Sequence, residues 1–287
     1  MPRALMPPSP TAPKRKAPAG AVDSHLHLLG GEFPLWEGRV EDPADDAKLD
    51  TWLDRYRAEM AALGFSRCVL VHSILYGADN SVTLEAVRRL GPAARGVGLL
   101  KDGTSPAEIA AFAKAGMVAV RLNYVHGGVL RWEGARAMAP ELADHGLHLQ
   151  MLLHSDQHMA DIAGDIRALP VPLVVDHLGW PDLARGVEDA GFQTLLALLA
   201  DGHIHLKLSA LYRLCRSPFE EAEPFVEAAM ATNPEALLWG TDWPFLMLSD
   251  AAQPTAAALL DAFDAVCPSD DVRQMVLVNN PARLFGF

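Results

Sequence analysis

Short apolar runs alternate with segments of helical periodicity along most of this chain. After residue 20, eight runs rich in Val, Ile and Leu predict strands, at residues 20–29, 67–75, 95–101, 117–125, 147–154, 172–179, 203–210 and 236–244. Apolar residues recur every three to four positions between them, as at 49–65, 105–116, 134–146 and 158–169, which predicts helices. Strands that read as almost continuous apolar runs are typical of a parallel sheet with helices on both faces.

Eight strand–helix units over residues 20–287 predict a single-domain (β/α)8 TIM barrel. A capping box with proline at the first helical position predicts a helix start at Ser105. Glycines stand where three helices should end, at Gly64, Gly116 and Gly146. The alternative is a doubly wound open sheet, but no G-x-G-x-x-G motif follows the first strand. The pattern therefore favours the barrel.

The first 19 residues differ from the rest of the chain in composition. They carry six prolines, four basic residues and no acidic residue, without the apolar stretch of a secretory signal. We expect residues 1–19 to form a disordered proline-rich tail.

The overall composition excludes several classes of partner. The net charge of −12 argues against nucleic acid or an anionic membrane as the main partner. No apolar run approaches the ~20 residues that span a bilayer. The three cysteines show neither a disulfide framework nor a metal-binding pattern, which suits a reducing, cytoplasmic location. The apolar C-terminal residues "ARLFGF" should pack on the barrel or contact another subunit of a homo-oligomer.

Polar residues at the carboxyl ends of the strands are the candidate functional residues, because active sites of such barrels lie there. They are His25, His27, His72, Ser73, Arg121, Asn123, His154, Asp176, His177, Lys207, Ser209 and Asp242. Side chains alternate along a strand, so only one of His72 and Ser73, and one of Asp176 and His177, should face the barrel interior. We expect structural roles for five other histidines and two tryptophans, with Trp243 as a possible pocket wall: His145, His148, His158, His203, His205, Trp239 and Trp243.

His25 and His27 form the most specific feature of the first strand. Residues two apart on a strand share a face, so both imidazoles should point into one space. The pair could hold a metal ion, a substrate or each other.

Three motifs in this order resemble the amidohydrolase superfamily: "VDSHLH", "VVDHLGWPD" and "LLWGTDWP". The chain is most similar to the branch of 2-pyrone-4,6-dicarboxylate lactonase and sugar-lactone hydrolases. Further similarity lies in "GADN", "VRLNYV", "SALYRL" and "NNPARLFGF". The resemblance implies a hydrolase that acts on the ester bond of a small-molecule lactone.

The resemblance also implies roles for individual residues. It makes Asp242 the general base, with His25, His27 and His177 beside it in the catalytic centre. The expected substrate-binding residues are Ser73, Arg121, Asn123, Arg213 and Trp180. Two further arginines and a tyrosine of the pyrone lactonase are replaced here by Gly127, Trp180 and Leu152. The loss of two charge-assisted contacts implies a less charged lactone, such as a sugar-acid or muconolactone-type compound.

The metal ligands of related metal-dependent enzymes are only partly present. The bridging lysine is replaced by Arg121, which cannot be deprotonated to carry a carboxyl group, and the histidine of the fifth strand by Leu152. His25, His27 and Asp242 could still hold one zinc or manganese ion, with His154 as a possible further ligand.

We expect catalysis that requires no cofactor. Asp242 would then take a proton from water while the histidines polarise the lactone carbonyl. The alternatives are a zinc-dependent decarboxylase or hydrolase of the same superfamily and a barrel that binds a small molecule without turnover.

Overall fold

Eight parallel strands form one sheet in chain order in the computed structural model, which describes residues 1–248 and 253–287. They are β1 (Val22–Leu26), β2 (Arg67–Val71), β3 (Ala94–Gly98), β4 (Met117–Asn123), β5 (His148–Leu152), β6 (Leu173–Val175), β7 (Ile204–Ser209) and β8 (Leu237–Gly240). The sheet closes where the Asp242 N–H donates to the His25 carbonyl (2.8 Å) and the His27 N–H to the Trp243 carbonyl (2.7 Å). The predicted (β/α)8 barrel is confirmed.

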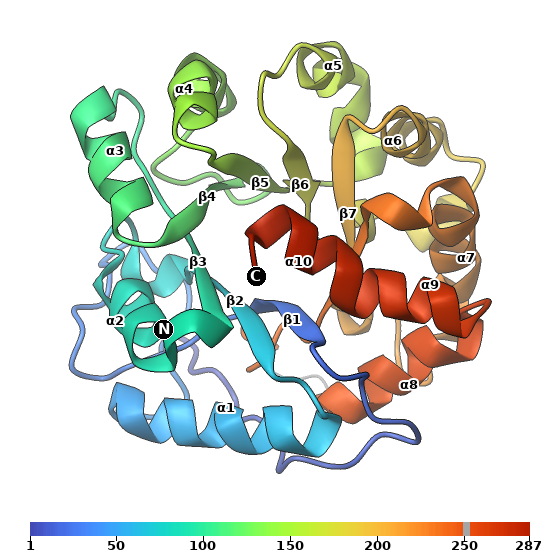
Figure 1. Cartoon of the computed structure of the whole chain (residues 1–287), viewed down its shortest axis with the longest axis horizontal. Coiled ribbons are helices and arrows are strands. Elements are labelled where there is room, and N and C mark those ends of the chain that lie inside the picture. Colours follow the sequence, from blue (N-terminus) through green and yellow to red (C-terminus); the bar gives the residue numbers. More distant parts are fainter. Residues whose placement is uncertain (249–252) are drawn as a thin grey trace.

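Helices surround the sheet, as Figure 1 shows. They are α1 (Leu49–Leu63), α2 (Ser81–Leu90), α3 (Pro106–Lys114), α4 (Trp132–Asp144), α5 (Ser155–Arg167), α6 (Ala190–Ala200), α7 (Glu223–Thr232), α8 (Ala256–Val266), α9 (Asp270–Gln274) and α10 (Asn280–Phe285). A π-helical turn at Met275–Asn279 joins α9 to α10. Within the described ranges, no helix is both long and apolar enough to cross a membrane.

Local sequence signals define several helix ends. The side chain of Ser105 accepts from the Glu108 N–H, and Glu108 in turn accepts from the Ser105 N–H, so the capping box at α3 is confirmed. Gly64 ends α1 in the left-handed region (φ 91°), where a residue with a Cβ atom would be strained. The turn glycines Gly116 and Gly146 adopt the same region after α3 and α4.

The C-terminal segment covers the amino-terminal end of the barrel. Helix α10 lies across the opening in Figure 1, and Phe285 is buried against residues such as Val22 and Val69 of the strands. Arg95 of β3 donates to the Phe285 carbonyl (3.1 Å). The prediction that this segment packs on the barrel is confirmed, and the active site must open at the other end.

The N-terminal segment runs along the outside of the barrel. The Ala17 N–H donates to the Leu63 carbonyl (2.8 Å), and Arg273 donates to the carbonyl of Lys16 (3.1 Å). Arg15 forms an ion pair with Asp270 (2.6 Å). The disorder expected for residues 1–19 stays a prediction, and hydrogen exchange of these amides would test it.

Most side chains expected to be structural pack as the sequence predicts. Trp239 stacks on Phe65 with ring centroids 5.3 Å apart, and Trp243 contacts Trp52 edge to face at 5.6 Å. His148 is buried beside Phe285, and burial lowers its pKa to about 3, so its ring is neutral. These residues belong to the packed core and not to the site.

Candidate active site

The carboxylate of Asp242 lies at the centre of the candidate site. Strand β8 ends at Gly240, and Asp242 two residues later adopts a left-handed conformation (φ 58°), which is uncommon for residues other than glycine. Thr241 is tied to β1 because its N–H and hydroxyl both donate to Asp23, at 2.9 and 2.7 Å. A Cβ atom on Gly240 would lie 2.6 Å from the backbone nitrogen of His25, so glycine permits this close approach of β8 to β1.

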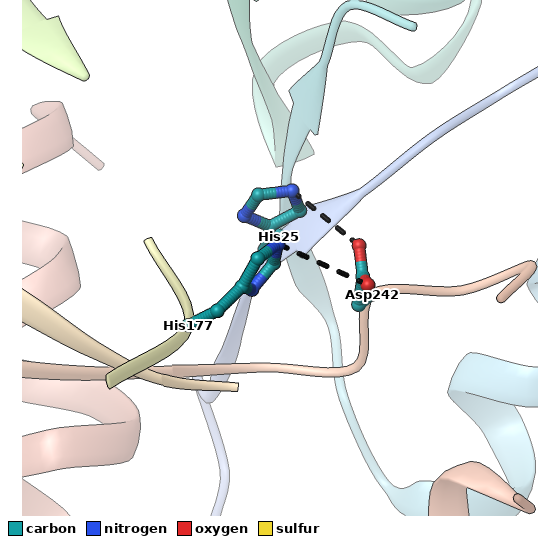
Figure 2. A group of neighbouring side chains, drawn as sticks. All are labelled: His25, His177 and Asp242. Carbon is teal, nitrogen blue, oxygen red and sulfur yellow. Dashed lines mark ion pairs between the residues drawn. The ribbon is translucent and has the colours of Figure 1, made fainter. Parts of the chain in front are cut away.

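Three histidines surround the Asp242 carboxylate. The Nε2 atoms of His25 and His27 lie 3.5 and 3.3 Å from Oδ1. The Nε2 atom of His177 lies 4.0 Å from Oδ2, and Figure 2 shows the rings of His25 and His177 facing the carboxylate. The structure therefore brings together all four residues that the sequence nominated as catalytic.

The second oxygen of Asp242 is held by two neighbouring residues of one turn. Tyr212 and Arg213, in the 3-10 turn Leu211–Arg213 after β7, donate to Oδ2 at 2.5 and 3.1 Å. Burial acts to raise the pKa of Asp242, but Arg213 and the neighbouring histidines outweigh it and hold the pKa well below its usual range. Asp242 is therefore ionised at neutral pH, with Oδ1 free to accept a proton.

We expect Tyr212→Phe to shift the acid limb of the pH–rate profile to higher pH. A hydrogen bond to the charged form of a carboxyl group lowers its pKa, so removal of the Tyr212 hydroxyl should raise the pKa of Asp242. The profiles of kcat/KM for the wild type and the variant provide the measurement. An unchanged acid limb would show that Asp242 is not the group that titrates there.

Hydrogen bonds at the Nδ1 atoms orient the three rings. His27 Nδ1 lies 2.7 Å from the Val71 carbonyl, which can only accept, so this nitrogen carries a hydrogen atom. His25 Nδ1 lies between a donor and an acceptor, Lys207 Nζ at 3.3 Å and Asp176 Oδ1 at 3.2 Å. His177 Nδ1 lies 2.9 Å from the Ser209 hydroxyl, which can donate or accept. Burial lowers the pKa of His25 well below its usual value and that of His177 to about 4, so both rings are neutral.

A buried ion pair lies beneath His25 inside the barrel. Asp176 Oδ1 is 3.3 Å from Lys207 Nζ and 3.2 Å from His25 Nδ1, and Gln150 donates to Oδ2 (3.1 Å). Burial lowers the pKa of Lys207 to about 8, against the opposing effect of Asp176.

The expectation that only one of Asp176 and His177 faces the interior is wrong. Strand β6 ends at Val175, so strict alternation of side chains ends there too. His177 and Leu178 follow with positive φ values of 54° and 57°, and this turn directs the imidazole of His177 toward the same interior that Asp176 occupies.

A cavity of about 290 Å³ opens beside Asp242. Its polar walls include His27 and His177 and the five expected substrate-binding residues Ser73, Arg121, Asn123, Arg213 and Trp180. His25 is absent from these walls and is fully buried behind them. Arg121 is buried, and its Nε atom has no hydrogen-bond partner among the described residues. The guanidinium donates to the His72 carbonyl (3.2 Å) and lies 3.7 Å from Asp176, so it places a partly compensated positive charge at the cavity wall.

His72 lies outside this cavity, whereas Ser73 lines it. This agrees with the expectation that only one of these two neighbours faces the interior. Its ring nitrogens contact the Thr83 hydroxyl (2.9 Å) and the Gly77 carbonyl (3.0 Å). Burial lowers the pKa of His72 to about 4, so the ring is a neutral structural element.

The residues at the centre fit one divalent metal ion in number and type. The potential ligands that the structure groups together are His25, His177 and Asp242, so His177 takes the place that the sequence analysis gave to His27. The His25 Nε2 and Asp242 Oδ1 atoms have no hydrogen-bond partner among the described residues. A bound zinc or manganese ion would polarise a carbonyl and lower the pKa of water. Lys207 and Arg213 oppose such an ion because they place positive charge against its ligands.

The possible ligand role of His154 is not supported by its position. Strand β5 ends at Leu152, and His154 precedes α5 with its Nδ1 atom 3.1 Å from the Trp180 carbonyl. Its ring packs on Trp180 at 4.9 Å, and His154 does not belong to the group of potential ligands.

Sequence reasoning missed several residues of the site. Tyr212 precedes Arg213 in "SALYRL", and that adjacency was the available signal for its contact with Asp242. Lys207 and Asp176 were recognised as polar strand residues but not as a pair that contacts His25. Leu246, Met247 and Leu248 also line the cavity, and nothing in their sequence marks them.

Known proteins resemble the chain over almost its full length. It is 32% identical to a 2-pyrone-4,6-dicarboxylate hydrolase of Comamonas testosteroni, with 96% of this chain and 93% of that protein covered. It is 33% identical to a 4-sulfomuconolactone hydrolase of Rhizobium radiobacter, with 94% and 91% covered.

Solved structures agree with these relatives. A Pseudomonas putida protein described as a candidate 2-pyrone-4,6-dicarboxylic acid hydrolase superposes with a TM-score of 0.78 at 31% identity, covering 93% of this chain and 97% of that one. An amidohydrolase of Burkholderia multivorans, solved with bound zinc, shares the fold at 20% identity, with a TM-score of 0.70 and coverage of 94% and 100%. The amidohydrolase family model matches residues 22–287. With its barrel, its histidine-ringed aspartate and these full-length matches, the chain belongs to the amidohydrolase family.

Proposed function

We propose that this protein hydrolyses the ester bond of a small-molecule lactone. The observation that carries the proposal is the asymmetric environment of Asp242. Its Oδ2 atom is held by Tyr212 and Arg213, whereas its Oδ1 atom faces the Nε2 atoms of His25 and His27 and has no hydrogen-bond partner among the described residues. Asp242 lines the cavity. A fixed, ionised carboxylate with one free oxygen is suited to take a proton from water. The lactone-hydrolysing relatives support the same reaction.

The three histidines would have different tasks in this reaction. His27 is held by the Val71 carbonyl with its Nε2 atom 3.3 Å from Asp242 Oδ1, so it would orient the attacking water by a hydrogen bond. His177 would donate from Nε2 to the lactone carbonyl, with the Ser209 hydroxyl donating to its Nδ1 atom. His25 lies behind the cavity wall and would position Asp242.

Lactone opening in this site would proceed in two steps, addition of water and cleavage of the ring C–O bond. Asp242 Oδ1 takes a proton from water as the water oxygen bonds to the carbonyl carbon. The donor hydrogen of His177 stabilises the resulting oxyanion. The ring C–O bond then breaks, and the proton on Asp242 returns to the leaving oxygen to give a hydroxy acid. The alkoxide oxygen of a lactone is a better leaving group than the nitrogen of an amide. Lactone opening therefore suits a carboxylate whose low pKa makes it a weak base.

The cavity favours a lactone with one anionic group. Two arginines line the cavity, and each is already partly neutralised by an aspartate: Arg213 donates to Asp242, and Arg121 lies 3.7 Å from Asp176. Gly127 and Trp180 supply no further cation. A monoanionic lactone thus fits better than a dicarboxylate.

We further propose that the reaction requires no cofactor, because Arg213 and Lys207 oppose a divalent cation at the ligand group. A zinc- or manganese-dependent hydrolase or decarboxylase is the second candidate, favoured by the grouping of His25, His177 and Asp242 and by the zinc-bound fold neighbour. A cytoplasmic location and a homo-oligomer stay predictions.

A panel of lactones, followed by acid release at constant pH, tests the proposed reaction. The panel should contain five- and six-membered rings with no, one or two carboxylates. We expect monocarboxylate lactones to be opened with the highest kcat/KM. Saturable binding of these lactones without acid release would contradict hydrolysis and indicate a binding protein.

A further inference from the structure

A second cavity of about 310 Å³ adjoins the catalytic cavity. Four residues form walls of both: Ile74, Asn123, His126 and Met247. We call this second space the side cavity; its remaining walls are Trp36, Gly38, Arg39, Val40, Gly127 and Gly128. The shared walls place the side cavity directly beside the space next to Asp242.

The side cavity offers an apolar surface to a ligand. Its large side chains are Trp36, Val40, Ile74 and Met247. The one charged wall residue, Arg39, donates to Asp42 (2.7 Å) and to the Trp36 carbonyl (2.9 Å), so its charge is already compensated.

The two polar residues at the boundary between the cavities carry no charge either. The side-chain oxygen of Asn123 accepts from the His126 N–H (2.9 Å). Burial and neighbouring cations lower the pKa of His126, which keeps its ring neutral. The boundary thus presents no ionic group that an apolar ligand would leave unpaired.

Exposed apolar side chains gather at this position. Six large apolar side chains of the described residues are exposed, and three of them belong to residues 1–6. The other three all line the side cavity: Trp36 (37% exposed), Val40 (54%) and Met247 (39%). Contiguous exposed apolar patches mark interaction sites and ligand-binding grooves, and these three side chains surround one cavity.

We propose that the side cavity binds an apolar substituent of the substrate, so that the substrate class is monoanionic lactones carrying an alkyl or aryl group. The proposal rests on the proposed function for the position of the lactone ring. The volumes agree with it, because the catalytic cavity alone lies at the lower limit of ligand pockets, which hold about 300–1,000 Å³. The anionic group would contact Arg121, and the apolar group would replace water against Trp36 and Val40.

A binding series tests this proposal independently of turnover. Lactams resist the hydrolysis expected of lactones, and a series with one carboxylate and a methyl, butyl or phenyl substituent can be titrated into the wild-type protein by calorimetry. We expect Kd to fall about fourfold for each methylene that becomes buried, with a more negative heat-capacity change.

Two variants locate the gain in affinity. Val40→Asp should abolish the advantage of the butyl and phenyl lactams and leave the Kd of the methyl lactam unchanged, because it puts a charge on the apolar wall. Val40→Thr should remove part of the advantage without adding charge. Ala111→Asp, on the exposed face of α3, adds the same charge outside both cavities and should bind every lactam as the wild type does.

The outcomes separate the two proposals. A Kd that does not change with the substituent, or a full gain that persists in Val40→Asp, would overturn the side-cavity proposal. If the gain is present but none of the corresponding lactones is hydrolysed, the side cavity is supported and the proposed hydrolysis fails. If lactones are hydrolysed and the lactams show no gain from the apolar substituent, the proposed hydrolysis is supported and the side-cavity proposal fails.

Discussion

Asp242→Asn is expected to lower kcat/KM for lactone hydrolysis by about 10²–10⁴-fold, the usual contribution of a general base. Asparagine preserves the shape of the side chain and can still accept from Tyr212 and Arg213. Its amide cannot take a proton from water, so the chemical step should be lost while the site keeps its form. Initial rates at saturating and limiting lactone concentrations give the measurement.

A matched variant distinguishes this loss from a general effect of charge. Asp54→Asn removes the same charge from the exposed surface of α1, where Asp54 forms an ion pair with Arg57 (3.0 Å). It should retain wild-type kcat/KM. An Asp242→Asn variant that unfolds like the wild type and also hydrolyses lactones at the wild-type rate would rule out Asp242 as the base.

Lys207→Met is expected to reduce the free energy of unfolding by about 2–4 kcal/mol, because it removes the nearer of the two cations that compensate the buried Asp176 carboxylate. Asp176 and Lys207 are both fully buried, 3.3 Å apart, and the next cation, Arg121, lies 3.7 Å from Asp176. Methionine matches the length of lysine, so the effect should arise from charge and not from a cavity. Urea-induced unfolding at pH 7 measures it.

The double variant Lys207→Met/Asp176→Asn provides the internal control. Once both charges of the pair are removed, no buried carboxylate remains at this position, and stability should recover part of the loss. The ion pair is not the source of stability if Lys207→Met unfolds within about 1 kcal/mol of the wild type, or if the double variant is less stable than Lys207→Met alone.

The barrel could be predicted from the sequence because its determinants are local. Runs of Val, Ile and Leu mark the strands, and Ser105, Gly64 and Gly116 mark helix ends through backbone geometry that these residue types favour. Parallel order then follows from the alternation of strands and helices, since each crossover returns the chain to the same end of the sheet.

The site could be predicted only as far as residue type and strand position allow. His25, His27, His177 and Asp242 could be nominated because polar residues are rare in apolar strands. Their relative orientation could not, because it depends on left-handed residues such as His177 and Asp242 and on contacts between distant turns. For the same reason the sequence did not reveal whether burial or nearby cations control the pKa of Asp242.

Hydrolysis and metal content measured on one metal-stripped sample test the central claim most directly. After dialysis against a chelator, metal analysis should find far less than one zinc or manganese ion per chain, and monoanionic lactones should be opened with the kcat/KM of the untreated protein. Activity that disappears on chelation and returns in proportion to one added ion per chain would contradict a reaction driven by Asp242 and the histidines alone.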